Sequence, residues 1–213
     1  MNKSILITRP NHDLATTYLY WWSKKIIDKC LEKKIKYFDL KGKKASKKNF
    51  DSYLKKNNPS FIFINGHGSE DVVTGWNNEI LLKVGDRLDV KDRVIYARSC
   101  MAGLKLGKVC VDSGAKTFIG YTKNYVLLFL TSRETRPLTD NLAALFLEPS
   151  NLIPISLIKG NTVEEADRKS KDLMKKNLKR ILSSDKSDKK EVTSYLWHDI
   201  KYQTVIGNNL AKI

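Results

Sequence analysis

The sequence predicts an α/β fold in which helices cover both faces of a mainly parallel sheet. Short apolar segments of strand length alternate along the chain with longer segments whose apolar residues recur at helical spacing. This alternation is typical of parallel strands joined by right-handed crossovers. The chain has 213 residues, of which 41% are hydrophobic and 29% charged. Such a length and composition suit one compact core, so we expect a single domain over residues 1–213.

The expected strands are apolar runs that end at polar or turn-forming residues. They cover residues 4–8, 35–40, 61–64, 93–97 and 116–122, with a further short strand near Ile155. Helical spacing predicts helices over residues 13–31, 49–56, 103–113, 140–146 and 162–182. Thr162 and Glu165 form the sequence signature of a capping box at the start of the last of these helices. Residues 69–92 carry many turn signals, and we expect irregular structure there.

The formal charge is +16, concentrated in lysine-rich runs at residues 41–48 and 175–190. These runs lack interleaved aromatic residues and any DNA-binding motif, so we interpret them as solvated surface, with nucleic-acid binding as the alternative. The apolar run before Arg9 is too short for a secretory signal, and residues 125–130 are too few to span a membrane. We therefore expect a cytoplasmic protein without a membrane partner.

The three cysteines differ in their predicted surroundings. No two of them have the spacing of metal ligands, and we expect free thiols and neither a metal nor a cofactor. Cys30 and Cys110 fall within predicted helices and are assigned to packing. Cys100 follows a predicted strand and precedes a predicted helix. At such a turn the positive end of the helix dipole would favour the reactive thiolate.

His67 lies between Gly66 and Gly68, directly after another predicted strand. Functional residues of parallel sheets collect at the carboxyl ends of the strands. If the strands 61–64 and 93–97 are neighbours, His67 and Cys100 lie over one cleft. Together they would supply a nucleophile, a proton donor, and the N–H groups of Gly68 and Cys100 as an oxyanion hole.

Several segments carry a resemblance to a known family. They are "NGHGS", "YARSCMAG", "GAKTFIGYT", "KGNTVEEADRKS" and "WHDIKYQTVIGN". Taken together they resemble the caspase-like cysteine peptidases of clan CD, a group that includes caspases, metacaspases, gingipains, legumain, separase and CHAT proteins. The similarity is greatest to the bacterial CHAT and gingipain-type branch. It implies a three-layer α/β/α caspase-like fold, with Cys100 as nucleophile and His67 as the acid that protonates the leaving amine. The family's Gln-Ala-Cys caspase signature is absent, so a preference for aspartate is not implied.

The residues that set substrate preference are less sharply defined by the sequence. Relatives that cleave after arginine or lysine use an acidic residue in the pocket, and Asp13 lies in a loop where such a residue occurs. The alternative role of Asp13, as the N-cap of the following helix, is favoured. Glu70, Asp71 and Ser99 are further candidates for contact with substrate. His12 and His198 are interpreted as surface or packing residues.

Three functional hypotheses follow from these observations. The first is a cysteine endopeptidase that acts on protein or peptide substrates as a regulated processing or defence protease, controlled by a protein partner. The second is a catalytically silent, basic interaction module of the same fold that binds nucleic acid or a protein. The third, a Rossmann-like nucleotide binder, is set aside because no glycine-rich phosphate-binding motif follows the first strand. The polar segment 183–191 is the expected site of proteolytic nicking.

Overall fold

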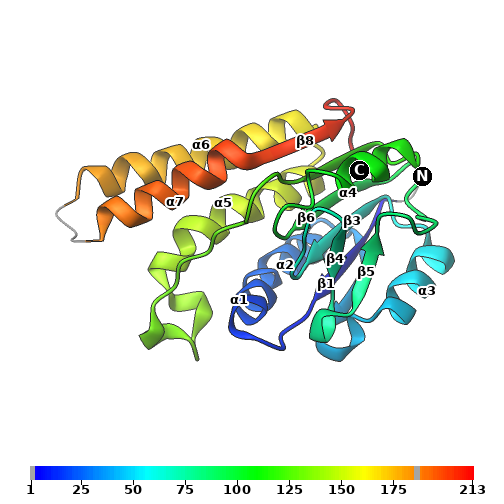
Figure 1. Ribbon diagram of the computed structural model, residues 1–213, viewed down its shortest axis with the longest axis horizontal. Coiled ribbons are helices and arrows are strands. Elements are labelled where there is room, and N and C mark those ends of the chain that lie inside the picture. The colour runs from blue at the N-terminus through cyan, green and yellow to red at the C-terminus, as the bar shows by residue number, and fades with distance from the viewer. Residues whose placement is uncertain (1–2, 185–187) are drawn as a thin grey trace.

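The computed structural model describes residues 3–184 and 188–213 and confirms the three-layer α/β/α architecture (Figure 1). Strands and helices alternate through most of the chain. In order, the elements are β1 (Ser4–Arg9), α1 (Leu14–Trp22), α2 (Lys24–Glu32), β2 (Lys36–Lys41), α3 (Lys47–Asn57), β3 (Phe61–Asn65), β4 (Val72–Thr74), β5 (Ile80–Lys83), β6 (Val94–Arg98), α4 (Leu106–Asp112), β7 (Thr117–Tyr121), α5 (Asn141–Ile158), α6 (Val163–Leu182), α7 (Lys189–Tyr202) and β8 (Gln203–Gly207).

The central sheet has six strands in the order β2-β1-β3-β6-β7-β8. The pairs from β2 to β7 are all parallel, and β8 is antiparallel to β7. Strands β3 and β6, which precede the candidate histidine and cysteine, are direct neighbours in the middle of the sheet. All five residues of β3 and of β6 are buried, as expected for strands covered on both faces.

Successive side chains of these strands point into two separate cores. Phe61 and Phe63 pack on the face covered by α2, α5 and α6. Ile62 and Ile64 pack on the opposite face, against α3, α4 and the β4–β5 hairpin. This alternation follows from the two-residue period of a strand. The sheet is therefore held rigidly from both sides, which fixes the loops at its carboxyl edge.

The segment 69–92 is more regular than the sequence predicts. It contains the antiparallel pair β4–β5, with a register shift between Val73 and Thr74. The turn signals at Asn77 and Asn78 are real, since both residues have positive φ. The strands were missed because they have only three and four residues, too few for a clear alternating pattern.

The predicted short strand near Ile155 is wrong, because that residue lies in α5. This helix continues through Pro149 and Pro154, which usually end or kink a helix. Tertiary packing outweighs that cost, since 67% of its 18 residues are buried. By length and hydropathy α5 is also apolar enough to cross a membrane, but such burial is the mark of a core helix.

Helices α6 and α7 run side by side and extend beyond the sheet (Figure 1). The capping box predicted for α6 is present, with Thr162 accepting from the Glu165 N–H and Glu165 bonding back to the Thr162 N–H. Residues 185–187 of the segment expected to be nicked lie outside the described residues. The remainder of that segment includes the start of α7 at Lys189.

Candidate active site

The register of β3 and β6 places His67 and Cys100 at equivalent positions of neighbouring loops. Asn65 is paired with Arg98, and each candidate residue follows its member of that pair by two positions. The loops also touch at Gly68. A Cβ atom at that position would lie 3.0 Å from the Cys100 carbonyl oxygen and 3.0 Å from the Ser99 Oγ. A side chain at this position would crowd the facing loop, so glycine favours close approach of the two loops.

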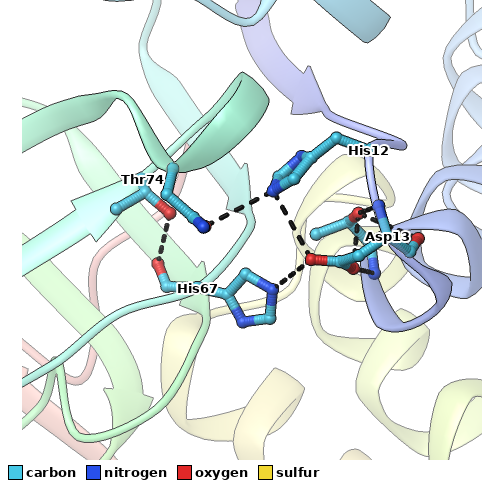
Figure 2. A network of polar contacts seen from close by, with 6 residues as sticks. His12, Asp13, His67 and Thr74 are labelled. Carbon is cyan, nitrogen blue, oxygen red and sulfur yellow. Dashed lines mark hydrogen bonds and ion pairs between the residues drawn. The ribbon is translucent and has the colours of Figure 1, made fainter.

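His67 is held from two directions (Figure 2). Its Nε2 atom lies 2.6 Å from the Asp13 Oδ2 atom. Its carbonyl accepts hydrogen bonds from the Thr74 N–H at 2.9 Å and from the Thr74 hydroxyl at 3.2 Å. The imidazole itself remains 45% exposed. His67 is thus fixed in orientation while its ring stays open to a ligand.

Asp13 performs two structural tasks with different oxygens. Its Oδ1 atom accepts a hydrogen bond from the Thr16 N–H at 2.8 Å and caps α1, which confirms the N-cap prediction. Its Oδ2 atom contacts His67. Burial raises the pKa of Asp13, but hydrogen bonds from the Thr16 amide, His67 and the Thr16 hydroxyl outweigh it, so the pKa lies below its usual value. The carboxylate is therefore charged at neutral pH and faces the imidazole.

Cys100 has a more enclosed setting. Its Sγ atom lies 4.0 Å from the Tyr125 carbonyl oxygen, to which the thiol donates. Burial raises the pKa of the Cys100 thiol, and the protonated form is favoured at rest. The expectation of a helix N-terminus at this position is wrong, because α4 begins only at Leu106. An irregular turn with Met101 at φ 54° intervenes, so the helix dipole acts too far from the sulfur to lower its pKa.

Two backbone N–H groups of the His67 and Cys100 loops, those of Gly68 and Cys100, are unengaged among the described residues. Among the hydrogen bonds of the residues described, neither the Gly68 nor the Cys100 N–H is a donor, whereas the next amide, of Met101, bonds to the Lys123 carbonyl. Backbone N–H groups of this kind are what an oxyanion hole requires.

Arg98 lies beneath this site, and the sequence reasoning missed it. Its side chain is fully buried, with Nε donating to Asn65 Oδ1 at 2.9 Å and Nη1 to Asn151 Oδ1 at 2.9 Å. Nη2 donates to Ser23 Oγ at 2.8 Å. These partners come from β3, α5 and the α1–α2 junction. A buried arginine at the end of β6 therefore ties the strand to the helices behind the two loops, and a polar residue inside an apolar strand was the available signal.

A pocket connects the candidate residues. Its lining comes from the first turns of α1, the two loops and the segment after β7, namely Ala15, Thr16, Leu19, Gly66, His67, Arg98, Ser99, Cys100, Tyr125 and Leu127. Of the substrate-contact candidates, only Ser99 is part of this lining. Its hydroxyl is buried and has no hydrogen-bond partner among the described residues.

The acidic candidates lie elsewhere. Asp71 forms an ion pair with Lys105 at 2.7 Å, and the Glu70 side chain is exposed while its carbonyl accepts from the Leu106 N–H. Asp13 is occupied by Thr16 and His67. Within the described residues, the pocket lining therefore contains no acidic side chain.

The remaining cysteines and histidines differ in their burial and in their contacts. Cys30 and Cys110 are free and fully buried, and burial raises the pKa of each thiol to about 12. His198 is a surface residue whose Nε2 lies 2.9 Å from the Asn124 carbonyl oxygen. His12 is different, because its side chain is only 10% exposed and its Nε2 lies 3.4 Å from Asp13 Oδ2. The sequence offered no sign of this proximity, since His12 and His67 are brought together by the fold.

Comparison with solved structures shows that the fold is the caspase-like fold of gingipain R. One match is the crystal structure of the Arg-specific cysteine proteinase gingipain R (RgpB), with a TM-score of 0.61 and 13% identity. Another is the complex of the Porphyromonas gingivalis RgpB pro- and mature domains, with a TM-score of 0.59 and 14% identity. Each match covers 100% of this chain, which spans about half (48%) of the matched chains. No protein-family model and no curated protein matches the sequence.

The fold therefore defines a class in which cysteine proteinases occur. At these identities the likeness concerns the backbone alone. The similarity to the CHAT branch stays a prediction.

Proposed function

We propose that this chain is a cysteine endopeptidase that uses Cys100 and His67. The observation that carries the proposal is the β3–β6 register, which brings the two residues to one pocket at the carboxyl edge of the sheet. The fold neighbours are cysteine proteinases, which supports the reaction class. No other cysteine of the described chain combines partial exposure with a neighbouring histidine.

In the proposed reaction, the Cys100 sulfur attacks the carbonyl carbon of the scissile peptide bond. The thiol passes its proton to His67 in this step, because burial keeps the thiol protonated at rest. The unengaged N–H groups of Gly68 and Cys100 stabilise the negative oxygen of the tetrahedral intermediate. His67 then gives this proton to the leaving amine as the C–N bond breaks, which leaves Cys100 acylated as a thioester. Water attacks the thioester carbonyl, the C–S bond breaks, and a proton from the water returns to the sulfur as the acid is released.

Asp13 supports this reaction through His67. Its contact with Nε2 fixes the ring and stabilises the imidazolium that forms when the histidine takes up a proton. We propose Asp13 as a positioning residue and not as a contact for a basic substrate side chain.

The pocket lining favours an apolar substrate side chain next to the cleaved bond. Ala15, Leu19 and Leu127 contribute apolar surface, and among the described residues no acidic side chain lines the pocket to pair with a basic one. Gingipain R is described as Arg-specific, and we propose that this chain does not share that preference.

A panel of fluorogenic peptides tests the function. Peptides with Leu, Arg, Lys, Asp or Asn before the scissile bond are incubated with the wild type, with Cys100→Ala, and with Cys110→Ala as the matched control. We expect cleavage by the wild type and by Cys110→Ala, best for Leu, and none by Cys100→Ala. Cleavage that survives in Cys100→Ala contradicts the assignment. Silence of all three proteins favours the second hypothesis, a basic interaction module.

Control by a protein partner, and action in the cytoplasm, belong to the same proposal. One of the fold neighbours is a complex between pro- and mature domains, which supports the idea that access to such a pocket is regulated by protein contact. The three free cysteines suit a reducing compartment. Co-purification of the tagged chain from its native cell extract, followed by the same peptide assay, tests whether a bound partner changes the cleavage rate.

A further inference from the structure

His12, Asp13 and His67 form a cluster of three metal-ligand side chains beside the pocket (Figure 2). One nitrogen of each histidine and one carboxylate oxygen all lie within 4.8 Å of one another. Asp13 Oδ2 is central, at 3.4 Å from His12 Nε2 and 2.6 Å from His67 Nε2. Donor atoms bound to one tetrahedral zinc ion are about 3.3 Å apart, given Zn–N and Zn–O bonds near 2.0–2.1 Å. In the His67–Asp13 and His12–Asp13 pairs, a movement of under about 1 Å by each side chain would bring the donor atoms to that separation.

His12 supplies an independent reason for a ligand at this place. Its side chain is nine-tenths buried, and its Nε2 atom has only long contacts, at 3.4 Å to Asp13 and 3.4 Å to Asn78 Oδ1. Its Nδ1 atom, on another side of the ring, also has no partner among the described residues, so it is the weakly engaged Nε2 that faces the cluster. The ring is held in place by Trp76, edge to face with centroids 5.6 Å apart. A buried imidazole that is fixed by packing and poorly satisfied by hydrogen bonds calls for a further partner.

We propose that His12, Asp13 and His67 bind a divalent transition-metal ion such as Zn²⁺, and that this ion inhibits the peptidase. Two imidazole nitrogens and one carboxylate oxygen suit zinc, cobalt or nickel better than magnesium or calcium. The inhibitory part of this inference rests on the proposed function, since a His67 ring bound to the ion through Nε2 keeps its proton on Nδ1 and cannot accept the proton of the Cys100 thiol. The binding part does not depend on catalysis.

The two oxygens of Asp13 make binding compatible with the fold. Oδ1 accepts the capping bond from Thr16, whereas Oδ2 faces both histidines. The ion replaces the proton between His67 Nε2 and Oδ2, and the neutral ring then carries its proton on Nδ1. The N-cap of α1 is left intact. Entry from solvent is open, because Asp13 and His67 are 37% and 45% exposed.

Titration calorimetry with Zn²⁺, and the visible absorption of Co²⁺, test the site on the whole chain. The variants are His12→Gln, which retains most of the side-chain volume, Cys100→Ala, and His198→Ala as a control for a surface histidine. We expect one equivalent of metal in the wild type, in Cys100→Ala and in His198→Ala. Affinity should fall at least tenfold in His12→Gln, and a thermal melt checks that this variant is folded.

The peptidase assay with and without Zn²⁺ tests the inhibitory part. We expect inhibition of the wild type that EDTA reverses, at zinc concentrations at least tenfold lower than those needed for His12→Gln. Equal affinity in the wild type and His12→Gln, no one-equivalent binding, or loss of binding in Cys100→Ala overturns the site. Binding without inhibition, or stimulation by zinc, overturns the regulatory part. Metal binding by a chain that cleaves no peptide supports the site and removes the proposed function instead.

Discussion

The two loops that form the candidate site differ in how the protein treats their functional groups. The His67 loop is polar and partly exposed, and a charged carboxylate fixes its ring. The Cys100 loop is enclosed, and its thiol faces a backbone carbonyl while burial raises the thiol pKa. One loop is thus arranged for a positive charge on its side chain, and the other is not arranged for a negative charge on the sulfur. For the proposed peptidase, this difference implies that proton transfer in the presence of substrate, and not the resting surroundings of the sulfur, activates Cys100.

The largest effect on activity is expected from removal of His67, the functional residue of the more exposed loop. His67→Ala should lower kcat by about 10²–10⁴-fold, because proton transfer to the leaving amine then depends on water. Single-turnover kinetics with the preferred fluorogenic peptide measure this loss. His198→Ala is the control and should retain the wild-type rate, because His198 is not among the residues that line the pocket. A His67→Ala variant with more than a tenth of that rate would contradict the proposed role.

Removal of the buried Arg98 side chain tests how the two loops are held in place from beneath. Arg98→Met should lower the free energy of unfolding by about 2 kcal/mol, because Asn65, Ser23 and Asn151 lose a charged donor inside the core. Urea denaturation measures this change. Arg93→Met is the matched control, since Arg93 is also buried but bonds to Asp89 and Asn58 at the other end of the strand. Both variants should be destabilised, and only Arg98→Met should also lose activity at temperatures where it stays folded.

Asp13→Asn separates charge from hydrogen bonding on the His67 loop. The amide oxygen still caps α1, but the negative charge facing the imidazole is gone, so we expect kcat to fall about tenfold. Thr162→Ala removes the matched cap of α6 and should cost about 1 kcal/mol of stability without a change in kcat. An unchanged kcat in Asp13→Asn would show that the His67–Asp13 contact is only structural.

The stability of Asp13→Asn should also depend on pH differently from that of the wild type under acid conditions. The pKa of Asp13 is lowered in the folded protein, so its stabilising contribution is present above the unfolded value of about 3.9. The contribution is lost as the pH falls through the lower, folded value. Urea denaturation between about pH 2 and pH 5 should therefore give a flatter profile for Asp13→Asn than for the wild type.

The smallest effect concerns the Cys100 thiol of the enclosed loop in the protein without substrate. Native protein treated with iodoacetamide should be labelled at Cys100 ahead of the fully buried Cys30 and Cys110. Because burial raises the Cys100 pKa, the labelling rate should still be rising with pH above about 8.5, the usual thiol value. Mass spectrometry of peptic fragments measures the rates. A rate that is already constant below pH 7 would indicate a resting thiolate and remove the contrast between the loops.

Much of the fold could be predicted from the sequence, because parallel strands that are buried on both faces consist of continuous apolar runs. Residues 61–64 and 93–97 differ from β3 and β6 by no more than one residue at each end. Two other regions, α5 and the β4–β5 pair, were harder to predict. The prolines of α5 indicate a break that packing overrides, and the short strands β4 and β5 lack a periodic signal.

The candidate site was only partly predictable for a related physical reason. His67 and Cys100 each follow a strand, so their meeting depends on strand order alone. The contacts of Asp13, His12 and Arg98 depend on side-chain placement across distant elements, which no local pattern encodes. The prediction that a helix dipole acts on Cys100 was wrong, because the chain makes an irregular turn before α4.

The first turn of α1 does more than lead away from the first strand. Asp13, which begins that turn, restrains the imidazole, and Ala15 and Thr16 within it form part of the pocket wall. Fraying of this single turn would widen the entrance and free the ring in the same event. A molecule that stabilises or destabilises the beginning of α1 would therefore alter both access to the pocket and the proposed proton transfer by His67.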